Sequence, residues 1–195
     1  MSVDLKQISE LREKTGVSIM KCKEALKAAD GDMEKAILEL RKQGEASAAK
    51  KSDRTAKEGV VASYIHHNGK IGAMVKLYCE TDFVARNEDF LALGNDIAMQ
   101  IAASDPKYLD PEQIPEDDLK QEEEVLRQAF KKENKHEEVI EKIIQGKLKK
   151  HKEENSLLKQ PYVKNSEITI EQLLTERVAK LGENIKIGEF IRFEI

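Results

Sequence analysis

The sequence has few cysteines, no long apolar run and no large excess of charge of either sign. Its two cysteines, Cys22 and Cys79, cannot form a disulfide framework, and we expect both to be small buried residues in a reducing compartment. No apolar run approaches the ~20 residues of a membrane span, and residues 1–10 lack the apolar core of a signal peptide. We therefore expect a soluble, cytoplasmic protein without a membrane partner.

The charge balance and the residue types also exclude several function classes. Acidic residues (37) slightly outnumber basic ones (33), and the net charge of -4 gives no general attraction to nucleic acid. A basic cluster at residues 147–152 contains no aromatic residue and is followed by Glu153 and Glu154, which favours a solvated helix face. No catalytic dyad, metal cage or phosphate cradle can be assigned. We expect no enzyme activity, cofactor or bound metal.

Residues 1–44 are predicted to form a module of three short helices. The apolar stripes are Leu5, Ile8 and Leu11, then Ile19, Cys22, Leu26 and Ala29, then Met33, Ala36, Ile37 and Leu40. Gly16 and Gly44 are expected to end the first and third helices, and Asp32 is a candidate N-cap. Isolated helices below ~12 to 15 residues rarely persist, so these three must pack together. Residues 45–58 have no apolar stripe and are predicted to be a solvated helix or linker at the domain boundary.

Residues 59–195 are predicted to form a core that contains an antiparallel sheet. Asn68-Gly69 favours a type I′ turn, and folding about it pairs Val60, Ala62, Tyr64 and His66 with Leu77, Val75, Ala73 and Ile71. One face of that hairpin is then apolar and is expected to pack on helices. The tail alternates as a third strand through Ile185, Ile187, Ile191, Phe193 and Ile195.

The other segments of the core are predicted to be helical. A helix after the candidate cap Asn87 carries Phe90, Gly94, Ile97, Ala98 and Ile101 on one side and ends at Asp105-Pro106. Two highly charged helices at about 116–155 suggest a projecting helical hairpin. Thr169 and Gln172 form a capping box for a last helix, which Gly182 ends. The expected fold class is therefore α+β.

The run from Cys79 to Asn87 sets an acid beside an aromatic residue where the second strand gives way to a helix. With no nucleophile or metal cage nearby, Asp82 and Phe83 are candidates for insertion into another protein. Two plainer interpretations stay open. Thr81 or Asp82 before a helix is more often an N-cap, and a phenylalanine is more often buried than protruding.

Five segments in order resemble translation elongation factor Ts. They are LREKTGVSIMKCKEALKAADGDMEKAILELRKQG, AAKKSDRTAKEG, SYIHHNGKIG, ETDFVARN and GENIKIGEFIRFEI, and together they span almost the whole chain. The resemblance implies a ubiquitin-associated-like (UBA-like) three-helix module, an α+β core, and guanine-nucleotide exchange on elongation factor Tu without covalent chemistry. It also implies that Thr81, Asp82, Phe83 and Val84 contact the partner and dislocate its Mg²⁺ ion.

The resemblance has a consequence for His66 and His67. Longer members of the family carry a histidine at a comparable hairpin that contacts the GTPase, so one of these two is a candidate second contact. We expect no shared metal ion, because successive strand residues point to opposite faces.

The resemblance also bears on assembly. Longer members contain two related core halves, whereas this chain has one, and two copies about a two-fold axis would restore the pair. We therefore expect a homodimer. The rival hypotheses are a non-catalytic adaptor that binds proteins through the helical module and an RNA-associated protein that uses residues 147–152.

Overall fold

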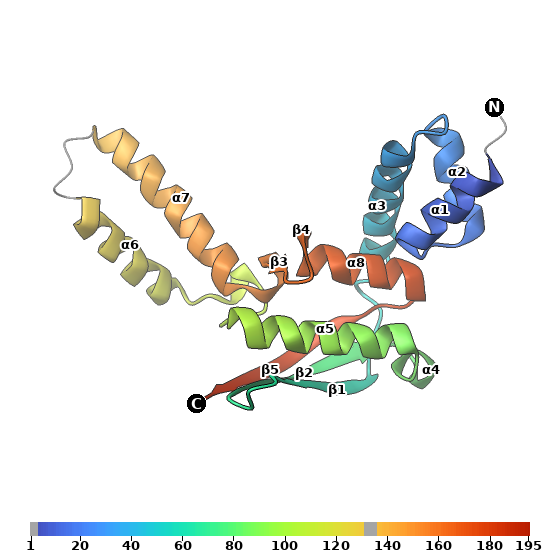
Figure 1. Cartoon of the computed structure of the whole chain (residues 1–195). Helices are drawn as coiled ribbons and strands as arrows, with labels where there is room; N and C mark the ends of the chain where they lie inside the picture. The colour runs from blue at the N-terminus through green and yellow to red at the C-terminus, as the bar shows by residue number, and fades with distance from the viewer. Residues whose placement is uncertain (1–3, 131–135) are drawn as a thin grey trace.

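The structure is a computed structural model that describes residues 4–130 and 136–195. It confirms the α+β class, with helices on one side of a small antiparallel sheet (Figure 1). Figure 1 shows the helical module α1 to α3 at one end of the molecule and the helical hairpin of α6 and α7 at the other. Residues 1–3 of the predicted module and residues 131–135 of the predicted hairpin lie outside the described residues.

The N-terminal helices are α1 (Leu5–Thr15), α2 (Ile19–Ala28) and α3 (Met33–Ala49). They pack through a cluster of their own, which confirms the predicted stripes except at two helix starts, where Leu5 and Ile19 are exposed. Gly16 ends α1 at a φ of 66°, and Asp32 caps α3 by accepting from the backbone of Glu34 and Lys35, both as predicted.

The predicted end of the third helix at Gly44 is wrong, since α3 continues to Ala49. Gly44 is buried in the interior of the helix, and a Cβ there would lie 3.6 Å from the Ala179 Cβ. Ala179 belongs to α8 (Ile170–Leu181), which packs along α3. This tertiary contact carries the helix through a glycine that would otherwise favour its end.

The main sheet contains β1 (Glu58–Ile65), β2 (Ile71–Cys79) and β5 (Lys186–Glu194) in the order β1-β2-β5. The predicted register is confirmed, with Val60 opposite Leu77 and Ala62 opposite Val75. The predicted type I′ turn is wrong. Gly69 has a φ of 68°, and its N–H donates to the carbonyl of His66 over 2.8 Å, so the turn spans residues 66–69. The side-chain oxygen of Asn68 accepts a hydrogen bond from the Lys70 N–H at 3.0 Å and stabilises this turn.

A β-bulge interrupts the alternation predicted for the last strand. Ile187 faces Leu77 but Phe190 faces Val75, so β5 holds one extra residue at this point. Before the bulge Ile185 and Ile187 are buried, whereas after it Ile191 and Phe193 lie on the exposed face. Gly188 fits the bulge because a Cβ there would come within 2.6 Å of the Tyr78 ring. The predicted third strand is therefore confirmed, but its apolar residues lie on the inner face before the bulge and on the outer face after it.

Helix α5 (Glu88–Ser104) covers the inner face of the sheet (Figure 1). Its predicted cap Asn87 and its predicted apolar side are confirmed, and Phe90, Ile97 and Ile101 are fully buried. Helix α8 lies on the far side of α5 from the sheet. The capping box of Thr169 and Gln172 and the left-handed cap at Gly182 are both confirmed.

The predicted helical hairpin is confirmed as α6 (Glu116–Phe130) and α7 (Glu137–Asn155), which project from the body. Short 3-10 helices flank it, η1 (Pro111–Gln113) and η2 (Leu157–Lys159). A small sheet of β3 (Pro161–Tyr162) and β4 (Asn165–Thr169) follows and was not predicted. At the base of the hairpin the buried Gln100 donates to Gln160 over 3.1 Å, which links α5 to the end of the hairpin.

Candidate functional site

The candidate site is the corner formed by residues 79–87, where β2 ends and the short helix α4 (Asp82–Ala85) begins. Thr81 is the N-cap of α4, and its hydroxyl accepts from the Val84 N–H at 3.4 Å. The helix is only four residues long because α5 starts at Glu88 with its own cap, Asn87. Thr81 is thus an N-cap, as the plainer interpretation of the sequence expected.

Phe83 protrudes from this corner. Its side chain is 80% exposed, so the alternative of a buried core phenylalanine is wrong. Asp82 beside it is also exposed and forms an ion pair with Arg86 at 3.0 Å. Such an exposed pair contributes little to stability, so the Asp82 carboxylate can exchange Arg86 for another donor at little cost.

The two remaining residues of α4 face inward. Val84 and Ala85 are 7% and 8% exposed and belong to the main hydrophobic core. The corner therefore presents Asp82 and Phe83 to solvent, while Val84 holds it on the protein. Val84 was predicted with the contact residues; in the single chain its side chain packs into the core.

Two acidic residues hold the corner, Glu183 from a distant part of the chain and Glu80 from the corner itself. The carboxylate of Glu183 accepts from the N–H groups of Glu80 and Thr81 at 3.0 and 3.1 Å and from the Thr81 hydroxyl at 2.6 Å. The carboxylate of Glu80 in turn accepts from the N–H of Asn184 at 2.6 Å and lies 3.5 Å from the Arg54 guanidinium. Sequence reasoning did not single out Glu80, Glu183 or Asn184, because these contacts cross about a hundred residues of chain.

Cys79 lies under the corner as a buried thiol that donates to the Thr81 carbonyl at 3.2 Å. Burial, and next the negative charge of Glu183, raise the pKa of this thiol to about 11. It is therefore protonated at neutral pH and offers no nucleophile. Both Cys79 and Cys22 are free and buried, as predicted.

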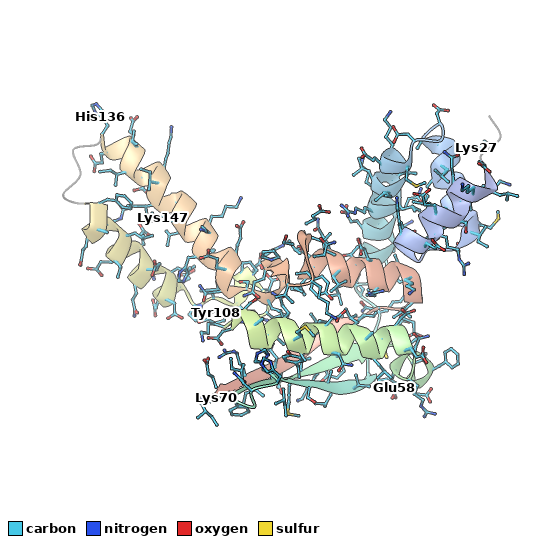
Figure 2. All side chains as sticks on the ribbon, viewed as in Figure 1. Lys27, Glu58, Lys70, Tyr108, His136 and Lys147 are labelled. Atoms are coloured by element: carbon cyan, nitrogen blue, oxygen red, sulfur yellow. The ribbon has the colours of Figure 1, made fainter. Side chains whose placement is uncertain are left out.

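His66 and His67 lie elsewhere, at the hairpin turn. Figure 2 shows the neighbouring Lys70 at the opposite end of the sheet from Glu58, which is the residue paired with Cys79. The nine residues of β2 separate that turn from the corner by about 26 Å at ~3.3 Å per residue. The structure thus does not bring the histidines to Phe83 within one chain.

The expectation that the two histidines point to opposite faces is wrong. They belong to the turn rather than to a strand, and their ring centroids are 4.2 Å apart. The Nδ1 of His66 lies 3.2 Å from the Tyr64 hydroxyl. Within residues 4–130 and 136–195 the structure contains no group of three or more histidine, cysteine or acidic side chains that could hold a metal ion.

The outer face of the main sheet carries exposed apolar side chains. Ser63, Met74 and Ile191 lie side by side across the strands, as do Ile65, Gly72 and Phe193. Exposure is 72% for Ile65, 47% for Met74 and 63% for Phe193. We name Val61, Ile65, Met74, Ile191, Phe193 and Ile195 the outer sheet patch. No helix in the described part of the chain is long and apolar enough to cross a membrane.

Comparison with known proteins gives one family over the whole length of the chain. The family model described as "Elongation factor TS" matches residues 5–195. The chain is 52% identical over 195 residues to elongation factor Ts of Thermodesulfovibrio yellowstonii, a match that covers 100% of this chain and 97% of that protein. It is 48% identical over 195 residues to elongation factor Ts of Fervidobacterium nodosum (100% and 99%), and 49% identical over 188 residues to that of Heliobacterium modesticaldum (96% and 87%). The chain therefore belongs to the elongation factor Ts family.

Proposed function

We propose that this protein accelerates the release of GDP from elongation factor Tu by binding that GTPase, without covalent chemistry. The observation that carries the proposal is the exposed Phe83 beside Asp82 on a corner held from below by the core and from the side by Glu183. An exposed aromatic side chain on a fixed support loses little entropy when it enters a partner's pocket.

The partner's Mg²⁺ ion is the sensitive point of this mechanism. Mg²⁺ demands near-octahedral oxygen geometry at ~2.0 to 2.1 Å, so a small shift of the helices around it weakens its coordination. Phe83 inserts between helices of the GTPase near the ion, and Asp82 orients it by accepting hydrogen bonds from the partner. The GTPase shape that results holds Mg²⁺ and GDP poorly.

The coupling between the two ligands is reciprocal. Whatever factor this protein applies to weaken GDP binding, GDP with Mg²⁺ applies to weaken the binding of this protein. Fresh nucleotide with magnesium therefore ejects the exchange factor and completes the cycle. The protein speeds exchange without selecting which nucleotide binds next.

We further propose that residues 1–44 form a UBA-like module and residues 59–195 the exchange core. The cluster of α1, α2 and α3 is separate from the main core cluster, which supports the division. Helix α3 crosses residue 44 and continues to Ala49, so the segment 45–58 begins as helix, one of the two alternatives expected for it.

We also propose that two copies of this chain form a homodimer through the outer sheet patch. Sheets that pack face to face lie ~10 Å apart and interdigitate apolar side chains. A two-fold axis allows the same patch to serve both copies. The patch spans all three strands of the main sheet, and Lys76 and Glu189 form a polar pair at 2.6 Å on the same face.

The test of the exchange function is the release of a fluorescent GDP analogue preloaded on elongation factor Tu. Catalytic amounts of the protein should accelerate the release. Phe83→Ala should reduce the second-order rate constant by about 30-fold or more, which corresponds to the ~2 kcal/mol of a hot-spot residue. Asp82→Ala should reduce it in the same direction.

The control variant is Val125→Ala, which removes another exposed apolar side chain, on α6, away from the corner. It should leave the rate unchanged. If micromolar protein leaves GDP release unchanged, the exchange function is wrong. If the protein accelerates release but Phe83→Ala performs equally well, the function stands and the insertion of Phe83 is wrong.

A further inference from the structure

Helix α4 cannot set its own position. It has four residues, whereas isolated helices below ~12 to 15 residues rarely persist in water. Phe83 is 80% exposed, and Asp82 forms an exposed ion pair with Arg86, which contributes little to holding it. The direction in which Phe83 points is therefore set by the burial of Val84 and Ala85 in the core and by the residues that hold the start of the helix.

Glu183 accepts hydrogen bonds from three donors in the two residues that precede the helix. Its Oε2 accepts from two consecutive backbone N–H groups, those of Glu80 and Thr81, and its Oε1 accepts from the Thr81 hydroxyl. The Thr81 N–H is the donor of the N-cap residue, and the Glu80 N–H belongs to the residue before it. Bonds to an ionised carboxylate are also stronger than bonds between neutral groups.

The bond to the Thr81 hydroxyl has a directional effect. Since this hydroxyl donates its single proton to Glu183, its lone pairs remain for the Val84 N–H, the bond that begins α4. The carboxylate thus fixes which way the cap points, and Asp82 and Phe83 are the next two residues along the chain.

The position of Glu183 is itself fixed by its neighbours in the chain. Glu183 follows Gly182, the left-handed cap of α8, and precedes Asn184, whose side-chain amide donates to the Ser52 and Arg54 carbonyls at 3.2 and 2.7 Å. The backbone of Asn184 donates back to Glu80. The junction between α8 and β5 and the segment before β1 therefore hold Glu183 in place.

We propose that Glu183 is a positioning residue for nucleotide exchange, which holds the Asp82-Phe83 corner in the geometry that enters the partner. The inference rests on the proposed exchange function. Glu183 acts through Phe83 rather than by touching the partner. Its removal lets the start of α4 fluctuate, so that binding has to order the corner and exchange becomes less efficient.

The experiment is a double-mutant cycle on release of fluorescent GDP from elongation factor Tu, measured with the full chain. Glu183→Ala should slow release by about tenfold or more in the wild-type background. In the Phe83→Ala background the same change should cost less than about twofold, since a residue that acts only through Phe83 has nothing left to position. A role limited to overall stability would give the same loss in both backgrounds.

Graded variants separate the individual bonds. Glu183→Gln keeps one acceptor oxygen and should give an intermediate rate, and Thr81→Ser should match the wild type. Thr81→Val should lose part of the rate because it can neither donate to Glu183 nor accept from the Val84 N–H. Relative to the wild type, Glu183→Ala should raise the amide hydrogen exchange rate at residues 80–84 and leave the rate in α5 unchanged. The matched control Glu171→Ala removes an acid of α8 that pairs with Lys159, away from the corner, and should change neither readout.

The outcomes distinguish two failures. If wild-type protein does not accelerate release, the exchange function is wrong. If Phe83→Ala slows release while Glu183→Ala and Thr81→Val do not, or if Glu183→Ala costs the same in both backgrounds, the exchange function stands and the positioning role is overturned. Should Glu183→Ala fail to fold, Glu183→Gln and Thr81→Val test the same inference.

Discussion

Gly94 and Gly146 both lie inside helices but in opposite surroundings. A Cβ at Gly94 would lie 2.8 Å from the Ala62 Cβ on β1, whereas nothing lies within 4 Å of a Cβ at Gly146 on α7. Gly94 therefore permits the close approach of α5 to the sheet on which the corner depends. Gly146 has no such role and only weakens its helix.

We predict that Gly94→Ala destabilises the protein by about 1 to 3 kcal/mol, because the new methyl group forces α5 away from β1. Gly146→Ala should instead stabilise α7 by about 1 kcal/mol through its better helix propensity. Urea unfolding followed by circular dichroism measures both. Equal changes in the free energy of unfolding for the two substitutions would show that α5 can move away from β1 without loss of stability.

The Cys79 thiol makes stability depend on pH in the alkaline range. Its pKa rises from 9.0 to about 11 on folding, so the folded protein holds the proton more tightly than the unfolded chain does. The contribution is fully present below pH 9 and is lost as pH rises through about 11. The free energy of unfolding should thus fall more steeply from pH 8 to pH 10 in the wild type than in Cys79→Ala. Parallel curves for the two proteins would contradict the burial of an ionisable thiol.

The corner also shows what single residues reveal before a structure exists. Phe83 could be found because an aromatic beside an acid at a strand end is an unusual local pattern, and its exposure agrees with that hypothesis. Glu183 could not be found, because its three donors lie about a hundred residues earlier in the chain. Local spacing carries no information about which distant carboxylate meets a given turn.

At the scale of elements, periodicity identified the helices and the hairpin register but not the places where packing overrides propensity. Helix α3 passes Gly44 because α8 lies beside it. The bulge in β5 did have a signal, since a glycine within a strand pattern, here Gly188, often marks one. The turn type at Asn68-Gly69 depends on one side-chain bond, which a dipeptide preference does not determine.

The helical hairpin is an element that the core does not need. Its buried residues Ile144 and Leu148 are not members of the main core cluster. Its two ends are already joined, since the N–H of Tyr108 donates to the Asn155 carbonyl at 3.1 Å and the N–H of Leu158 to the Leu109 carbonyl at 3.0 Å. Figure 2 shows Tyr108 at the base of the hairpin and His136 at its far end.

We therefore predict that replacing residues 110–154 by a short Gly-Ser linker leaves a folded core. The shortened protein should keep a cooperative thermal transition and lose helical signal in proportion to α6 and α7. Amide exchange should remain slow in β2 and α5. A molten shortened protein would show instead that the hairpin is part of the cooperative unit.

At the scale of the whole molecule, one chain presents two candidate contacts at opposite ends of a hairpin. The corner with Phe83 follows the end of β2, and the turn with His66 and His67 precedes its start. If two chains pack by their outer sheet patches about an axis that runs across the strands, the corner of one copy lies at the end where the other copy has its turn. A single GTPase could then meet a corner and a histidine turn from different copies.

If the protein is a dimer, one charged substitution in the outer sheet patch should halve its mass in solution. Wild-type protein at tens of micromolar should scatter light as twice 22.1 kDa. Phe193→Glu should scatter as 22.1 kDa, because its carboxylate would be buried in an apolar interface close to its two-fold mate. Leu38→Glu, at an exposed apolar position on α3 outside the patch, should stay dimeric. Circular dichroism should show both variants folded, since each site is exposed in the single chain. The dimer is contradicted if the wild-type protein scatters as a single chain of 22.1 kDa alone and contributes one chain to its complex with elongation factor Tu. The histidine turn would then act from the same chain as the corner or not at all.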